Sequence, residues 1–419
     1  MSNTINVKIP NNNLNERKYI LNIIFNEFLG LEYVLKIGSA DYEIELENKK
    51  VLDIKDTFFN KYPKDLEYLQ LENMPNKIED LDIFSASFFM LTRWEEYVNK
   101  NRDAHNRFPA YESLAFKQGF LNRPVVNEYV EELKKALLVL DDSLVFKKYE
   151  YKFLLTHDVD ALLKYNGLKN GLIEIAGDIL KRKSIKNVFS SILRQYRVHT
   201  GIQKDPYDTF DYLMDISEKI GLKSYFFFMG KGVTKFDNQY DSSDEFVKNL
   251  AVKIKERGHY IGMHPTYNAY NNQEQFLKEK QELKKNLDSS LAFGREHYLR
   301  FEVPTTWQIW EDNGMIWDST LSYADKEGFR CGVCYEYSVF NILTRKKLKL
   351  KEKPLIVMEG SFATYQPNIK PEEMEEKIKL LIEQVKKYNG EFVFLWHNSS
   401  FNTPLWKKYQ NIYGRILSK

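Results

Sequence analysis

The chain has 419 residues, of which 43% are hydrophobic and 29% charged, a composition typical of a folded globular protein with room for two or three domains. Its formal net charge of +2 argues against a dedicated nucleic-acid-binding protein, because such proteins usually carry a strong basic excess. No apolar run reaches transmembrane length, and the N-terminus lacks the apolar core of a signal peptide. Two cysteines are too few for a disulfide framework, so we expect a cytoplasmic location.

Residues 1–145 are predicted to form a small α/β domain. Apolar residues at helical spacing predict a helix over 16–29, and short alternating stretches predict strands at 33–37, 42–46 and 51–54. Further helices are predicted over 82–97 and 127–140, followed by a polar linker at 141–150. Five charged residues are interpreted as surface pairs and interdomain contacts rather than as a ligand site: Arg93, Glu95, Glu96, Arg107 and Arg123.

The second domain is predicted to begin at residue 151 with a buried strand, FLLTHDVD, which ends in ionisable side chains. In parallel sheets and barrels, functional groups lie just past the carboxyl ends of the strands. We therefore expect Asp158 and Asp160 at the mouth of a cleft, where one carboxylate can hold a metal ion and the other can accept a proton. The alternative is a strand that ends in an ordinary Asp-rich turn.

Residues 161–205 stand where a short loop would be expected after that strand. They contain nine lysine and arginine residues and three acidic ones, a local net charge of +6, with helical patterns at 172–180 and 188–196. Such a basic amphipathic insertion fits a phosphate-bearing substrate or a peripheral contact with an anionic membrane surface. A solvated helical lid is the simpler interpretation, which we favour.

Helices and strands alternate from residue 205 onwards. Strands are predicted at 224–229, 259–264, 298–303, 315–318, 355–359 and 392–396, with helices at 210–220, 246–254, 276–287, 307–313 and 371–388. This alternation predicts an α/β fold, either a parallel barrel or an open sheet covered by helices. Carboxylates, imidazoles and guanidinium groups follow five of the segments, so we expect them at one rim of the sheet.

The order of these motifs resembles the polysaccharide deacetylase family, the NodB-homology domain of carbohydrate esterases, from about residue 152 to the C-terminus. GHYIGMHPTYN at 258–268 is similar to the second family motif, GHEIGxHTxxH, and THDVD at 156–160 resembles the first. LRFEVPTTW, the Asp318 region and FLWHN resemble the third, fourth and fifth motifs. The N-terminal region resembles an uncharacterised domain that precedes deacetylase domains in some bacterial glycan-gene proteins.

The resemblance implies a distorted (β/α) barrel of the NodB-homology type and a hydrolase with one divalent metal ion, zinc in the first instance and cobalt, nickel or manganese as alternatives. It implies that Asp160 and His264 bind the ion, which would activate water and polarise the acetyl carbonyl. It also implies that Asp158 is the general base and His397 the general acid.

Supporting roles follow from the same resemblance. Arg295 or Arg300 would hold Asp158 in its charged form, because a nearby guanidinium favours the carboxylate. Asp318 or Asp325 would orient His397 through its second ring nitrogen. Backbone N–H groups after Arg300 are candidates for an oxyanion site.

The sequence departs from the family pattern at Asn268, which stands where the family has a second metal-binding histidine. A carboxamide oxygen is a weaker ligand than an imidazole. Asn268 itself, His297 or His157 could complete the site, or the site could lack both metal and activity. We favour an active site with His297 or Asn268 as the third ligand.

Substrate contacts are assigned to polar and aromatic residues within or near the motifs: His157, Tyr267, Trp307, Asp325, Arg330 and Trp396. Most of the tryptophans are expected in the core, and Asp325 and Arg330 have loop bracing as their alternative role. His259 is expected on the strand face opposite to His264, whereas His105 and His199 are predicted to be surface residues.

The function predicted from these features is removal of an N-acetyl group from an amino sugar of a cytoplasmic glycan precursor, either nucleotide- or lipid-linked. The alternatives are an O-acetyl esterase on the same scaffold, a catalytically weak glycan-binding protein, and a scaffold whose N-terminal domain recruits glycosyltransferases.

Overall fold

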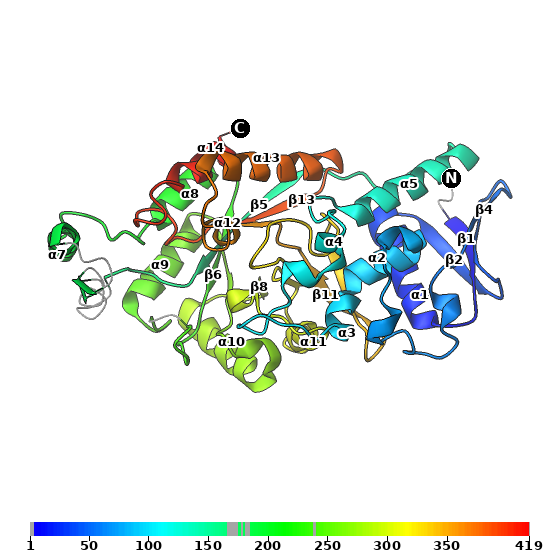
Figure 1. Cartoon of the computed structure of the whole chain (residues 1–419), viewed down its shortest axis with the longest axis horizontal. Helices are drawn as coiled ribbons and strands as arrows, with labels where there is room; N and C mark the ends of the chain where they lie inside the picture. The colour runs from blue at the N-terminus through cyan, green and yellow to red at the C-terminus, as the bar shows by residue number, and fades with distance from the viewer. Residues whose placement is uncertain (1–3, 166–174, 177–178, 181–184, 238–239, 419) are drawn as a thin grey trace.

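The computed structural model describes residues 4–165, 175–176, 179–180, 185–237 and 240–418. These residues form a mixed α/β structure with two separately hydrogen-bonded sheets. The molecule is elongated, with the small sheet at one end, the large sheet in the middle and helix α7 (Ile185–His199) at the other end (Figure 1). In the described part of the chain, no helix is long and apolar enough to cross a bilayer.

The small sheet has the strand order β2-β1-β3-β4. Its strands are β1 (Thr4–Ile9), β2 (Glu32–Ile37), β3 (Tyr42–Glu45) and β4 (Val51–Ile54). The three predicted strands are confirmed, whereas β1 was not predicted. It pairs parallel to β2 and antiparallel to β3, and its alternating Ile5, Val7 and Ile9 are buried because every second side chain of a strand faces the same side.

Helices cover this sheet and connect it to the rest of the molecule. They are α1 (Leu14–Leu21), the π-helix η1 (Asn22–Leu29), α2 (Ile83–Thr92), α3 (Trp94–Val98), α4 (Leu114–Lys117), α5 (Val125–Leu140) and the short turns η2 (Phe59–Lys61), η3 (Leu71–Asn73), η4 (Ile78–Asp80) and η5 (Ala110–Glu112). Asp82 caps α2, accepting hydrogen bonds from the backbone N–H groups of Phe84 and Ser85 at 3.1 and 2.9 Å. The single helix predicted over 82–97 is interrupted at Arg93, whose φ of 52° is left-handed.

The large sheet has the strand order β10-β11-β9-β8-β7-β6-β5-β13-β12. Its strands are β5 (Lys152–Val159), β6 (Ser224–Phe228), β7 (Tyr260–Met263), β8 (Phe293–Gly294), β9 (Trp317–Asp318), β10 (Tyr337–Asn341), β11 (Lys346–Glu352), β12 (Val357–Met358) and β13 (Glu391–Leu395). Neighbouring strands are parallel except in the β10–β11 hairpin, which was not predicted. The predicted parallel sheet is therefore confirmed. A closed barrel is not shown, since the described pairings run from β10 to β12 without joining them.

Helices surround the large sheet. They are α8 (Phe210–Lys219), α9 (Glu245–Glu256), α10 (Gln273–Leu287), α11 (Thr305–Asp312), α12 (Glu359–Ala363), α13 (Pro371–Lys387), α14 (Gln410–Leu417) and the turns η6 (Ala269–Asn271) and η7 (His297–Leu299). The strand predicted over 298–303 is wrong, because η7 turns the chain there. The helix predicted over 188–196 is confirmed within α7, and most of the one predicted over 172–180 lies outside the described residues.

The two sheets are joined through a buried charge network. Glu96 in α3 accepts hydrogen bonds from Arg93 at 2.8 Å and from Arg330, beyond β9, at 2.9 and 2.5 Å. All three side chains are buried, so the prediction that Arg93 and Glu96 are surface residues is wrong; both contact residues of the second half of the chain, Tyr323 and Arg330. Burial opposes ionisation of Glu96, but Arg330 and Arg93 outweigh it and lower its pKa to about 2.

The Glu96→Gln substitution is expected to lower the free energy of unfolding at neutral pH by about 3 kcal/mol, because it leaves buried guanidinium groups without their carboxylate. The contribution of Glu96 is complete above the ordinary glutamate pKa of 4.5 and is lost as the pH falls towards 2. The difference between wild type and variant should therefore shrink over that range. Chemical denaturation over a series of pH values measures it.

Glu128→Gln is the matched control, because Glu128 accepts a hydrogen bond from the exposed Arg123 at 3.0 Å. Exposed pairs contribute less than about 1 kcal/mol, so this variant should be nearly as stable as wild type. Equal losses in the two variants, or a Glu96→Gln deficit that persists in acid, would contradict the proposed role of the buried network.

Candidate metal centre

Six neighbouring parallel strands, β8, β7, β6, β5, β13 and β12, end at one edge of the large sheet. Polar side chains follow these strand ends in the same order: His297, His264, Asp237, Asp160, His397 and Glu359. Because parallel strands present their carboxyl ends on the same side, segments up to 237 residues apart in the chain meet there.

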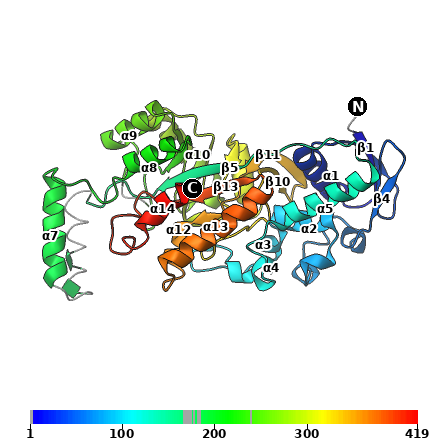
Figure 2. The same ribbon diagram turned by 90° about the horizontal axis from the view of Figure 1, so that it is seen from above.

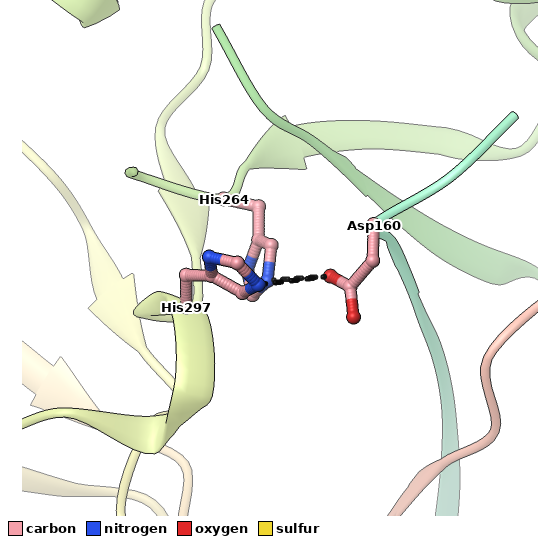
Figure 3. Close-up of side chains that lie close together, drawn as sticks. All are labelled: Asp160, His264 and His297. Atoms are coloured by element: carbon pink, nitrogen blue, oxygen red, sulfur yellow. Dashed lines mark ion pairs between the residues drawn. The ribbon is translucent and has the colours of Figure 1, made fainter. Parts of the chain in front are cut away.

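Asp160, His264 and His297 form the centre of this group. One possible ligand atom from each lies within 4.8 Å of the others. His264 Nε2 is 3.1 Å from Asp160 Oδ1, and His297 Nε2 is 3.7 Å from the same oxygen (Figure 3). Both histidines are buried, whereas 36% of the Asp160 side chain is exposed, so the centre opens to solvent at Asp160.

The other ring nitrogen of His264 makes a hydrogen bond, and that of His297 lies near a carboxylate. His264 Nδ1 donates a hydrogen bond to the carbonyl oxygen of Arg295 at 2.7 Å, and His297 Nδ1 lies 3.5 Å from Asp237 Oδ1. A carbonyl only accepts hydrogen bonds, so Nδ1 of His264 carries a proton and Nε2 is the ring nitrogen that faces Asp160. This support at the second nitrogen is common for metal-binding histidines.

The close approach of β7 and β8 makes the His264–Arg295 contact possible. Gly294 ends β8 immediately before Arg295, and a Cβ atom built on it would lie 1.8 Å from the Met263 carbonyl oxygen. Only glycine allows this spacing, so a small residue at the strand end brings His264 and Arg295 together.

The donor set fits a divalent cation. Asp160 Oδ1 is buried and has no hydrogen-bond partner among the described residues, despite its short distance to His264. Burial by itself would raise the pKa of Asp160, but the imidazoles of His297, His397 and His264 hold it well below its usual range. One carboxylate and two imidazole nitrogens are ligands typical of zinc and similar ions.

His297 therefore completes the cluster, and the other two candidate ligands lie elsewhere. Asn268 is exposed, and its Oδ1 accepts a hydrogen bond from Arg300 at 3.3 Å. His157 is buried on the opposite face of β5, where its ring nitrogens contact the Trp396 carbonyl oxygen at 2.7 Å and Ser224 Oγ at 3.3 Å. Strand alternation explains this position, and it excludes His157 from both the predicted metal and substrate contacts.

Asp158 borders the cluster and is held by Arg295. Arg295 Nη1 donates to Asp158 Oδ1 at 2.8 Å and to Thr156 Oγ1 at 3.0 Å, and the guanidinium is fully buried. Arg300, the other predicted partner, instead donates to the His105 carbonyl oxygen at 2.9 Å and lies over the rings of Tyr267 and Tyr270. Arg295 is therefore the arginine that contacts the predicted base.

His397 lies on the other side of Asp160, with its Nε2 3.5 Å from Asp160 Oδ2. Its Nδ1 is 2.6 Å from Glu359 Oε1, an oxygen that also accepts hydrogen bonds from His397 N and Ser400 Oγ. Burial disfavours the imidazolium, but the carboxylates of Glu359 and Asp160 outweigh it and raise the pKa of His397 to about 10. Sequence reasoning missed Glu359, although it directly follows β12.

The two aspartates predicted to orient His397 have other partners. Asp318 Oδ1 accepts hydrogen bonds from the Thr320 N–H at 3.0 Å and from its hydroxyl at 2.5 Å. Asp318 on β9 lies beside Glu352 on the neighbouring strand β11, and burial raises the pKa of Asp318 to about 7. Asp325 Oδ1 accepts a hydrogen bond from the Ala110 N–H at 3.1 Å. The prediction that Asp318 or Asp325 orients His397 is therefore wrong, and Glu359 is the carboxylate that contacts its Nδ1.

Most of the predicted substrate contacts are structural. Trp307 and Trp396 are fully buried, and Trp307 Nε1 donates to Glu352 Oε2 at 3.0 Å. Arg330 is buried in the interdomain network described above. Tyr267 differs from these, because its ring stacks on Phe236 with centroids 4.5 Å apart beside the metal centre.

The N-terminal part of the chain reaches this aromatic region. His105 Nδ1 is 3.0 Å from the Tyr267 hydroxyl, and Arg107 donates to the Tyr298 carbonyl oxygen at 3.1 Å. His105, predicted at the surface, is half-buried and contacts this aromatic region. Tyr298 follows His297, its ring packs against the His297 imidazole, and its φ of 61° is unusual for a residue with a side chain. Such strained backbone is often found at functional sites.

The N-terminal part of the chain matches a known protein family. Residues 5–141 match a family described as "Family of unknown function (DUF7033)", which agrees with the resemblance of this region to an uncharacterised domain. No curated protein sequence matches the chain significantly.

One similar solved structure is described as a "putative polysaccharide deacetylase" from Mycobacterium smegmatis. It is 14% identical in sequence, with a TM-score of 0.40, over 65% of this chain and 85% of that one. So distant a likeness does not inform the site, which we interpret from its own geometry.

The substitutions Asp160→Asn, His264→Gln and His297→Gln are each expected to abolish metal binding, lowering the content from about one divalent ion per chain to near zero. Asn268→Ala should keep the ion, because Asn268 lies outside the cluster. Elemental analysis after incubation with zinc, cobalt, nickel or manganese measures the content of each variant. Loss of the ion in Asn268→Ala together with its retention in His297→Gln would reverse the assignment of the third ligand.

Proposed function

We propose that this protein is a metal-dependent carbohydrate N-deacetylase, a hydrolase that removes an N-acetyl group from an amino sugar of a cytoplasmic, nucleotide- or lipid-linked glycan precursor. One observation carries the proposal: the Asp160–His264–His297 cluster has a carboxylate on one side, Asp158, and an imidazole on the other, His397. Amide hydrolysis needs a proton acceptor and a proton donor on either side of the reacting carbonyl group.

The proton acceptor in this proposal is Asp158. Arg295 holds its Oδ1, and its Oδ2 lies 4.0 Å from His264 Nδ1, so the carboxylate is fixed beside the ligand cluster. Water attacks the acetyl carbonyl carbon and gives up a proton to Asp158. The buried Arg295 guanidinium fixes the position of Asp158.

The proton donor is His397, whose Nε2 faces the cluster. Glu359 holds Nδ1 and stabilises the imidazolium, so the ring enters the reaction with a proton on Nε2. That proton passes to the amine nitrogen as the C–N bond breaks, which releases acetate and the free amino sugar. The proton transfer is favourable because imidazolium is a stronger acid than the neutral amine that forms when the departing nitrogen is protonated.

A divalent ion held by Asp160, His264 and His297 would supply Lewis acidity, lowering the pKa of water and polarising the carbonyl oxygen. The half-buried aromatic side chains Phe236 and Tyr298 beside the cluster offer flat apolar surface for a sugar ring. The choice of an N-acetyl sugar over another acyl substrate rests on the resemblance of the sequence motifs to polysaccharide deacetylases.

The Asp158→Asn and His397→Gln substitutions are expected to lower kcat by about 10²–10⁴-fold, the usual contribution of a positioned acid or base, while metal content stays at the wild-type level. Acetate release from N-acetylglucosamine oligomers and UDP-N-acetylglucosamine measures the activity, and hydrolysis of p-nitrophenyl acetate measures the esterase alternative.

Asp325→Asn is the matched control, because Asp325 only accepts a backbone hydrogen bond that an asparagine oxygen can also accept. It should retain activity. Ester hydrolysis without acetate release from any N-acetyl sugar would favour the O-acetyl esterase. A metal-loaded protein inactive on both classes of substrate would sink the hydrolase proposal and leave glycan binding as the alternative.

A further inference from the structure

Helix α7 carries an apolar stripe that faces solvent. Phe189, Ile192, Leu193 and Tyr196 are 72%, 48%, 49% and 60% exposed. Their spacing of i, i+3, i+4 and i+7 places them on one side of the helix. Ser191, nearly opposite to the stripe, is buried, and Val188 and Val198 on the same side are half-buried, so the four stripe residues lie on the side of the helix that faces solvent. Soluble proteins usually orient an amphipathic helix the other way round.

The helix also projects from the rest of the molecule. In two views at right angles to one another, α7 stands apart from the large sheet and its surrounding helices (Figures 1 and 2). Within the described part of the chain, the helix therefore does not pack against the large sheet or its surrounding helices, which leaves room for a partner to approach it.

The charge of the helix is positive. Its fifteen residues include Arg194 and Arg197 and no aspartate or glutamate, and residues 161–205 as a whole have a net charge of +6. A helix with Phe and Leu on one side and basic residues on another has the composition of helices that lie in the headgroup region of anionic membranes.

The base of the insertion is fixed beside the metal centre. Asp205 accepts hydrogen bonds from the N–H groups of Lys164 and Tyr165 at 2.8 and 2.9 Å, which joins the beginning and the end of the insertion. Asn398, the residue after His397, donates to the Ala161 carbonyl oxygen at 2.8 Å. Ala161 directly follows Asp160, so the insertion begins at the centre itself.

We propose that α7 is a membrane-surface anchor, which inserts its apolar stripe into the headgroup region of an anionic lipid bilayer. This inference does not depend on the chemistry proposed for the metal centre. It explains why the apolar stripe faces outwards, why the insertion is basic and why the helix stands away from the body.

A second copy of the chain fits these observations less well. From the size and exposure of the four side chains, the stripe offers on the order of 400 Å² of apolar surface, about half of the ~800 Å² that each partner of a specific complex usually buries. A dimer interface would also place the arginines of two identical helices close together. A bilayer has neither limitation, because its anionic headgroups attract those arginines.

The test is co-sedimentation of the full-length protein with vesicles of phosphatidylcholine alone and of an equimolar mixture with phosphatidylglycerol. We expect at least about tenfold tighter binding to the mixed vesicles, weakened by added salt. Phe189→Glu and Leu193→Glu should each lower that binding about tenfold or more, because a carboxylate on the stripe opposes insertion. Arg197→Gln should lower it about fivefold, the effect of one cation near an anionic surface.

Leu380→Glu is the matched control, because Leu380 is a 60% exposed leucine on α13, away from α7. It should bind vesicles like the wild type. Thermal unfolding and metal content should be unchanged in all of these variants, since the replaced side chains are exposed and distant from the centre. Variants that fail the unfolding control are replaced by Phe189→Ser and Leu193→Ser.

Three results would overturn the proposal: no vesicle binding by the wild type, equal binding to neutral and anionic vesicles, or stripe variants that bind like Leu380→Glu. A dimer in light scattering that the stripe variants dissociate, without vesicle binding, would assign the stripe to a second copy of the chain instead. Metal content and acetate release are measured on the same variants without vesicles, so a failure of the anchor and a failure of the proposed chemistry give different results.

Discussion

The carboxylate of Asp160 is the charge on which the site depends. Three imidazoles surround it, with ring nitrogens at 3.1, 3.5 and 3.7 Å, and they come from the ends of three other strands. Each unprotonated ring nitrogen and each carboxylate oxygen has a lone pair. At these distances, the lone pairs need protons or a metal ion between them. The hydrogen bonds behind the rings, to the Arg295 carbonyl oxygen and to Glu359, then decide which nitrogens face the centre. The parallel direction of six strands is what makes this meeting possible, because an antiparallel strand would present its last residue at the opposite edge.

The sequence predicted this arrangement where long apolar strands precede the functional residue. β5, β6 and β13 are such strands, and their ends placed Asp160 and His397 correctly at the shared edge. β12 has only two residues, and although the strand predicted over 355–359 ends at Glu359, nothing in the sequence connects that residue with His397. Asp237 lies in a loop, where a carboxylate cannot be distinguished from an ordinary surface residue. His157 is a different case. The alternation of side chains that places Asp158 and Asp160 on one face of β5 places His157 on the other face, away from the metal centre.

Contacts between the two halves of the chain were harder to predict than contacts within either half. Charged residues such as Glu96 and Arg330 are usually found at the surface of a protein. Only the folded structure shows that they form an ion pair in the interior. The same holds for the segment around His105 and Arg107, which packs against the residues that follow His264 and His297. The aromatic region beside the metal centre is therefore built by both halves. We infer that the N-terminal part contributes to the shape of the site without providing a ligand to the metal cluster.

The position of the insertion links the metal centre to the surface that α7 presents. The chain leaves β5 at Asp160, and Asn398 holds the next residue while its neighbour His397 faces the centre from β13. Asp205 closes the base of the insertion by accepting hydrogen bonds from the N–H groups of Lys164 and Tyr165. In the proposed anchored state, this base would connect the surface-bound helix to the strand ends that carry the site. The lipid-linked substrate named in the proposed function would also lie at the bilayer surface, so the proposed anchor and the proposed chemistry would act at the same place.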